Sequence, residues 1–476
     1  MRPAALDRSV PPPPGEIRPF HFPAFERQTL PSGLQVLAAR LPGVPLVSLE
    51  LLTPAGAQYD PAGAAGLATL TGGLLDEGTA GHDAMEIAAR VEGLGGHLAT
   101  GADWDVGYLA TGLLSRHLAA GIDLLAEVAT SPTFPGQELE RLRRERLAEI
   151  LRRGQDPSLL ADERLAEVIY RGTVYAHSPL GSPASIGALR RDTIVDFYRR
   201  HYPLRGATLI AVGDLDPEAL LGEVVSAFDR AAGPAGAEGA SARPPSPPEI
   251  RPTPLPGIAV HVVDRPGAAQ TELRLGHAGV PHHHPDYMAL SVLNSLLGGK
   301  FTSRINLNLR ERHGYTYGAS SRFSGRLGPG PFAVSAAVET GSAGAAAREV
   351  LAELRRIREE LVEPEEMEDT RSYVLGIIPC TFQTIADLTR RLQNLAIYGL
   401  PDDYFDRYMK RVASLTRQEL LELAQRRLDP EHIAVVAVGP AETLLRQLDG
   451  LGEVTLHPPR AETLAEVPAG SAAERG

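Results

Sequence analysis

The chain has 476 residues, of which 43% are hydrophobic and 22% are charged, as is usual for soluble globular proteins. Its 59 Asp and Glu residues outnumber its 47 Lys and Arg residues, so with a formal net charge of −12 we expect no general affinity for nucleic acid or for acidic membranes. The single cysteine, Cys380, excludes an internal disulfide and a cysteine-based zinc site, and we expect it to be a small buried residue.

The N-terminal segment has a different composition from the rest of the chain. Residues 1–24 are rich in proline, including the run Pro11 to Pro14, and we expect them to form an extended arm. The arm has neither the apolar core of a signal peptide nor a stretch that could span a membrane, which favours a cytoplasmic location.

From residue 25 onward the pattern is that of mixed strands and helices. Three β-prone runs at 25–30, 34–40 and 46–53 are separated by turn residues, and a helix that begins near Gly66 and closes at Gly78 follows them. The next expected elements are a helix at 83–94, strands at 95–101 and 105–114, helices at 115–130 and 135–153, a strand ending at Gly213, and a helix beginning near Pro217.

A linker and an internal repeat divide the chain. Residues 231–256 are rich in Ala, Gly, Pro and Ser without an apolar period, which is typical of a linker. The turn residues of the first part recur after it at a constant offset of 224: Gly33, Pro42, Gly43 and Pro61 match Gly257, Pro266, Gly267 and Pro285. We therefore predict an α+β protein of two tandem halves, residues 25–230 and 257–455, followed by a flexible tail at 456–476.

The segment Gly66 to Thr79, GLATLTGGLLDEGT, resembles the active-site helix of the pitrilysin or insulinase type (M16, inverzincin) of zinc peptidase, which usually reads GLAHxxEHxxFxGT. In that motif two histidines bind zinc and the glutamate activates water. Thr69, Gly72 and Gly73 occupy those three positions, and their side chains cannot do this work. We expect this chain to bind no metal itself.

The resemblance covers about residues 25–455. It implies that each half is an α/β sandwich of the LuxS/metallopeptidase type, and that the halves face each other as a clamshell around a chamber.

Two other positions in the first half match the family. Glu149 lies 76 residues after Gly73, in the place of the third zinc ligand, but one carboxylate cannot hold zinc. The alternative is that it pairs with arginines on a polar helix face. The segment Gly95 to Ala102, GGHLATGA, resembles the family's substrate strand, GGxxNAxT. Gly95 and Gly96 are therefore candidate substrate-binding residues, whereas Ala99 stands where Asn is usual.

The second half retains a different motif. Its segment LGGKFTSRINLNLRERHGYTYGASSRF resembles the family stretch GGxxSRLFxxLRExxGLxYSxxS, in which an Arg and a Tyr hold the peptide and stabilise the oxyanion. Arg310 and Tyr317, seven residues apart, match that pair. The alternatives are a surface ion pair for Arg310 and an ordinary strand start for Tyr317.

A run of three histidines, His282 to His284, invites a metal interpretation. Consecutive side chains point in different directions on a helix or a strand, so such a run rarely binds one ion. By the repeat, Leu293 stands opposite Thr69, so neither copy of this helix carries metal ligands. An independent hydrolase with another metal set therefore has little support.

Some members of the family divide their work between two similar chains, of which one has the zinc helix and the other has the Arg/Tyr pair. The resemblance implies that this chain is of the second kind. Its partner would be an HxxEH subunit that carries the zinc, and the substrate would be a peptide or an unfolded polypeptide. The alternative is a catalytically inactive structural or peptide-binding protein, comparable to the core subunits of respiratory complexes that lack zinc.

Overall fold

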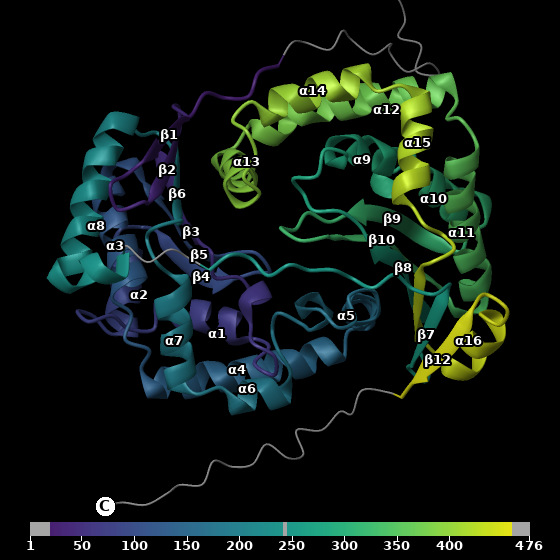
Figure 1. Cartoon of the computed structure of the whole chain (residues 1–476), viewed down its shortest axis with the longest axis horizontal. Coiled ribbons are helices and arrows are strands. Elements are labelled where there is room, and N and C mark those ends of the chain that lie inside the picture. Colours follow the sequence, from purple (N-terminus) through teal and green to yellow (C-terminus); the bar gives the residue numbers. More distant parts are fainter. Residues whose placement is uncertain (1–19, 241–244, 459–476) are drawn as a thin grey trace, which may run out of the picture.

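The computed structural model describes residues 20–240 and 245–458, which form two six-stranded sheets on opposite sides of the molecule (Figure 1). The first sheet has the order β1-β2-β6-β3-β5-β4. Its strands are β1 (Glu26–Thr29), β2 (Gln35–Arg40), β3 (Leu46–Thr53), β4 (His97–Ala102), β5 (Gly107–Leu114) and β6 (Thr208–Gly213). The second sheet has the order β12-β7-β11-β8-β10-β9. Its strands are β7 (Ala259–Asp264), β8 (Gln270–Ala278), β9 (Thr316–Phe323), β10 (Pro331–Glu339), β11 (Ala434–Gly439) and β12 (Glu453–His457).

The sheet order confirms the internal repeat. In each half one inner strand, β6 or β11, pairs in parallel with one neighbour and antiparallel with the other. Both strands are buried along their whole length, which explains their continuous apolar sequences. At Gly213 φ is +146°, and a Cβ atom would lie 2.2 Å from the carbonyl oxygen of Leu46, so only glycine fits there.

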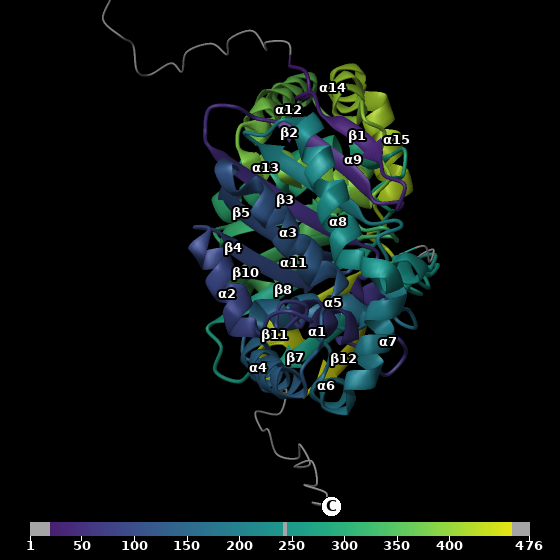
Figure 2. The same cartoon turned by 90° about the vertical axis from the view of Figure 1, so that its left-hand side faces the viewer.

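In the described residues eight α-helices belong to the first half of the chain and eight to the second. The first set is α1 (Leu67–Gly73), α2 (Ala84–Gly93), α3 (Leu118–Thr130), α4 (Gly136–Gly154), α5 (Pro157–Ile169), α6 (Pro183–Ala188), α7 (Arg191–His201) and α8 (Pro217–Ala240). The second set is α9 (Tyr287–Asn294), α10 (Arg304–Asn306), α11 (Ala343–Glu359), α12 (Pro364–Ile377), α13 (Ile385–Ile397), α14 (Tyr404–Ser414), α15 (Arg417–Arg427) and α16 (Ala441–Gln447). Helices α3 and α8 cover the outer face of the first sheet (Figure 2).

The two halves exchange one helix each. Helix α5 of the first half packs on β8 and β11, and α13 of the second half packs on β3 and β6 (Figure 1). Arg274 of β8 has only 4% of its side chain exposed, and its Nε donates to Asp162 of α5 at 2.6 Å. Gln393 of α13 donates to Glu50 of β3. Because each sheet is covered by a helix from the other half, the halves face each other in a defined orientation, as the resemblance implied.

Several boundaries differ from the sequence-based expectations. Helix α1 ends at Gly73, so the expectation that Gly78 closes it was wrong; two consecutive glycines weaken the helix before that point. Helix α8 includes residues 231–240 of the predicted linker, and β12 extends into the predicted tail. Residues 1–19 of the expected arm and 459–476 of the tail lie outside the described residues.

The position of the single cysteine also differs from the expectation. Cys380 is exposed, so its assignment to the interior was wrong. It lies in the short 3₁₀ turn Ile378–Phe382, which buries its first and last residues and turns the cysteine outward. No helix among the described residues is long and apolar enough to cross a membrane.

Candidate functional site

The helix that corresponds to the family's zinc helix, α1, is buried against the edge of the first sheet. All residues from Leu67 to Gly72 are buried. A Cβ atom at Gly72 would lie 2.5 Å from the backbone carbon of Gly101 in β4, so the helix backbone rests directly on the strand. At the other end, Asp60 accepts the backbone N–H groups of Gly66 and Ala68, both at 2.8 Å. Burial raises the pKa of Asp60 to about 7, and these two hydrogen bonds oppose the shift.

Thr69, in the place of the motif's first histidine, has a hydroxyl that contacts three protein groups. Its hydroxyl donates to the carbonyl oxygen of Pro179 at 2.8 Å. The same proton is shared with the carbonyl oxygen of Gly66, which lies 3.2 Å from Thr69 Oγ1. It also accepts a 2.7 Å hydrogen bond from Nη1 of Arg146, a residue of α4. The oxygen is therefore engaged by protein groups.

Arg146 also contacts Glu149, the residue in the place of the third ligand. Its Nε lies 3.4 Å from Glu149 Oε2, one turn along α4. Burial lowers the pKa of Arg146, and Glu149 partly opposes that shift. The guanidinium thus bridges Thr69 and Glu149, and the arginine pairing that was weighed for Glu149 is confirmed. Arg146 was not predicted from the sequence, although its i,i+3 spacing from Glu149 is a signal that could have identified it.

These residues do not fit a zinc ion. Gly72 and Gly73 offer no donor atoms, Thr69 is engaged by three groups, and Glu149 faces a guanidinium. Within residues 20–240 and 245–458, no group of three or more His, Cys, Asp or Glu side chains could hold a metal ion.

Gly95 and Gly96 precede the edge strand β4. Gly95 has φ of +67°, and a Cβ atom at Gly96 would lie 2.8 Å from the carbonyl oxygen of Gly112. The turn therefore requires both glycines whether or not a substrate binds. The outer edge of β4 pairs with no other strand of the described chain, and Ala99 is exposed on it. This edge could accept an extended peptide through its backbone groups.

Arg310 and Tyr317 lie close together in the chain on either side of a tight turn. Arg310 belongs to a π-helical turn, Leu307–Arg312, that packs against β9, the strand in which Tyr317 is the second residue. Gly314, with φ of +66°, reverses the chain between them. Asn306 anchors the segment, because it accepts the Ala319 N–H at 2.9 Å and donates to the carbonyl oxygen of Phe301 at 2.6 Å.

The side chains of this pair are accessible. The Arg310 guanidinium lies 4.6 Å from the ring centroid of Phe301 and 3.3 Å from Glu311, which is itself 57% exposed. Tyr317 is 91% exposed and Phe301 is 64% exposed. Both alternatives from the sequence describe this arrangement: Arg310 has a surface ion pair and Tyr317 lies at the start of a strand. An ion pair with an exposed partner is weak, so Arg310 remains available to an incoming anion.

The three consecutive histidines lie in three different environments. His282 is buried between the rings of Tyr287 and Tyr398, each at a centroid distance of 4.1 Å, and burial lowers its pKa to about 4. His283 is exposed, and His284 lies 3.2 Å from a nitrogen of Arg427. Their side chains do not converge.

Two related protein-family models match most of this chain. Residues 35–182 match a family model described as insulinase (peptidase family M16), and residues 188–374 match one described as the peptidase M16 inactive domain. The chain is 25% identical over 310 residues to an uncharacterized zinc protease of Streptomyces coelicolor, a match that covers 65% of this chain and 67% of that protein. It is 22% identical over 389 residues to the non-peptidase homolog YmxG of Helicobacter pylori, covering 79% of this chain and 85% of that protein.

A solved structure agrees with these matches. The peptidase M16 inactive domain from Pseudomonas fluorescens superimposes with a TM-score of 0.79 and 27% sequence identity. The superposition covers 87% of this chain and 98% of that one, so it includes both halves.

Proposed function

Because the chain belongs to the M16 (insulinase) family of peptidases, we propose that it is the non-catalytic subunit of a heteromeric M16 zinc peptidase. In this proposal Arg310 and Tyr317 act on substrate bound at the site of an HxxEH partner, and zinc is held by that partner alone. The observation that carries the proposal is the contrast between two sites. At the zinc-motif site Arg146 contacts both Thr69 and Glu149, whereas on the anchored turn Tyr317 is exposed and Arg310 is half-buried with a weak ion pair.

The chemistry of the pair suits this role. A guanidinium can donate two hydrogen bonds to a carbonyl or carboxylate oxygen of a peptide, which would orient the chain. A tyrosine hydroxyl can donate to an oxygen that gains negative charge in the transition state, and such donors accelerate acyl transfer. Phe301 would hold the Arg310 guanidinium in place through its 4.6 Å stacking contact. The unpaired edge of β4 is the candidate surface for an extended peptide or unfolded polypeptide.

The test is hydrolysis of casein or a fluorogenic peptide by this chain alone, by the HxxEH partner alone, and by the mixture. We expect activity in the mixture, and a loss of about 100-fold with Arg310→Ala or Tyr317→Phe while assembly is unchanged in gel filtration. Arg312→Ala is the matched control, since Arg312 is exposed on the same turn. Zinc-dependent cleavage by the isolated chain, or no gain on mixing, would contradict the proposal.

The second candidate is a catalytically inactive structural or peptide-binding protein. It is favoured by the partners that Arg310 already has within the chain, Phe301 and Glu311, which can explain its retention without a substrate. In that case Arg310→Ala and Tyr317→Phe change neither the turnover of any mixture nor the assembly.

A further inference from the structure

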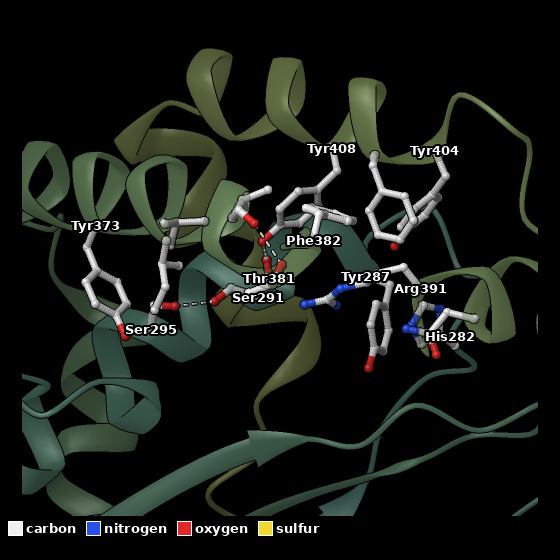
Figure 3. A pocket seen from close by; sticks show the side chains of 15 residues that line it. His282, Tyr287, Ser291, Ser295, Tyr373, Thr381, Phe382, Arg391, Tyr404 and Tyr408 are labelled. Atoms are coloured by element: carbon white, nitrogen blue, oxygen red, sulfur yellow. Dashed lines mark hydrogen bonds between the residues drawn. The ribbon is translucent and has the colours of Figure 1, made fainter. Parts of the chain in front are cut away.

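A pocket that contains none of the family-motif residues lies in the C-terminal half between α9, α12, α13 and α14 (Figure 3). Its volume is about 390 Å³, which is within the range of small-molecule sites. Aromatic rings form much of its wall, four of them from the tyrosines 287, 373, 404 and 408. Phe382 and Phe405 contribute two more rings, and these pack against Phe20 and Phe22 of the N-terminal segment, so the wall is held from outside.

The pocket carries one uncompensated charge. Of the fifteen described residues that line it, none is acidic, and Arg391 is the one permanent cation. The other basic residue, His282, is neutral at pH 7 because burial lowers its pKa to about 4. A half-buried cation with no carboxylate among the residues that line its pocket is costly, so this arrangement favours an anion there.

Arg391 has no ion-pair partner among the residues that the structure describes. Its Nε is buried without a hydrogen-bond acceptor, and its contacts are with the rings of Phe382 and Phe405, at 5.4 and 5.9 Å. Asp387, one turn earlier on α13, is engaged by Arg390 and by the hydroxyl of Thr384. Figure 3 shows the Arg391 side chain reaching toward the middle of the pocket, among the side chains of Ser291, Tyr287 and Phe382.

The ring wall and the single guanidinium together define a ligand class. We propose that this pocket binds an amphipathic carboxylate, with its carboxylate on Arg391 and an aromatic or branched apolar body between the tyrosine and phenylalanine rings. One guanidinium matches one carboxylate in a two-bond geometry. The hydroxyl groups of the lining residues Ser295 and Thr381 already donate to the backbone carbonyl oxygens of Ser291 and Ile378, at 2.8 Å each, so they offer a ligand only acceptor positions. This inference is independent of the function proposed for Arg310 and Tyr317.

The carboxylate could belong to a free organic acid or to the C-terminus of a peptide, and the probes distinguish these sources. Isothermal titration calorimetry at millimolar ligand would compare 3-phenylpropionate, N-acetylphenylalanine and N-acetylphenylalanine amide. We expect both acids to bind and the amide to bind at least about 10-fold more weakly. Tighter binding of N-acetylphenylalanine indicates a peptide C-terminus, and tighter binding of 3-phenylpropionate indicates a free acid.

Variants of α13 assign the binding to Arg391. Arg391→Met should weaken both acids by about 10- to 100-fold, and Arg391→Lys by less, since the charge is kept. Arg390→Met is the matched control, because this neighbouring arginine is 61% exposed and pairs with Asp387 outside the pocket. Equal binding of acid and amide, unchanged binding by Arg391→Met, or no binding of either acid overturns the proposal. The comparison of acid and amide on the unmodified chain remains decisive if Arg391→Met does not fold.

Discussion

Arg146 Nη1 donates a 2.7 Å hydrogen bond to Thr69 Oγ1, so a guanidinium of α4 reaches the position where the family motif has its first zinc ligand. The same side chain lies 3.4 Å from Glu149, at the position of the third ligand. A positive charge of the protein thus lies between two positions that hold a cation in zinc-binding members. This explains the retention of Glu149 in a helix pair without metal ligands, because the carboxylate still faces a positive group.

Replacing Arg146 by methionine should destabilise the chain by about 1–3 kcal/mol, since a partly buried charged donor and its hydrogen bond to Thr69 are lost. The ion pair contributes less to this figure, because Glu149 is 37% exposed and solvent screens it. Urea unfolding measures the change. Arg144→Met, on the exposed face of the same helix, is the control and should lie within about 0.5 kcal/mol of the wild type. Equal stability of the two variants would show that the bridge has no energetic role.

Two adjacent glycines of α1 should respond differently to alanine. At Gly72 a Cβ atom meets the backbone of Gly101 at 2.5 Å, so Gly72→Ala should cost about 1–3 kcal/mol through overpacking. At Gly73 a Cβ atom meets nothing within 4 Å, and Gly73→Ala should be neutral or stabilising because alanine favours a helix. Thermal unfolding of both variants measures this difference, and a similar loss at both positions would contradict it.

The same contact predicts that the zinc motif cannot be restored by three substitutions. A chain with Thr69→His, Gly72→Glu and Gly73→His should be less stable than the wild type, because the glutamate must displace β4. It should also retain no stoichiometric zinc after dialysis, as measured by elemental analysis. A stable, zinc-loaded triple variant would show that α1 can move away from β4.

Phe301 offers a test of how Arg310 is positioned, and this prediction rests on the proposed function. Phe301→Ala removes the ring at 4.6 Å from the guanidinium, and the turnover of the mixture with the HxxEH partner should fall about 2- to 5-fold. Stability should change little, since Phe301 is 64% exposed. Leu307→Ala, at another exposed apolar residue nearby in the chain, should leave turnover unchanged. Loss of turnover in both variants would indicate general disturbance of the turn.

Asp105 joins the two halves and should make stability depend on pH. Its carboxylate accepts the backbone N–H of Leu327 at 3.2 Å, and burial, followed by the nearby Asp103, raises its pKa from 3.8 to about 7. The folded state therefore holds this proton more tightly than the unfolded state. The resulting stability is complete below pH 3.8 and is lost as the pH rises through about 7.

The variant Asp105→Asn stays neutral at every pH and keeps an oxygen acceptor for Leu327. Its Tm relative to that of the wild type should therefore rise between pH 4 and pH 8, when the wild-type carboxyl loses its proton. Differential scanning calorimetry across this range is the measurement. A difference in Tm that does not vary with pH would contradict the raised pKa.

Local sequence patterns identified the repeat, the missing ligands at Thr69, Gly72 and Gly73, and the segment of Arg310 and Tyr317. These features depend on turn chemistry and on the donor atoms of individual side chains, which neighbouring residues reveal. The end of α1 and the exposure of Cys380 were not predicted correctly. Both depend on which face of a short segment packs against distant parts of the chain.

The sequence by itself determined that two similar α+β halves are joined in one chain and that its zinc helix has no zinc donors. The tertiary structure decided what occupies the space instead, because only folding brings Arg146 of one helix to Thr69 of another. It also decided that α5 and α13 cross between the halves, and that Arg391 faces a pocket without a carboxylate. These relationships arise from packing between residues far apart in the chain, which no local period or spacing encodes.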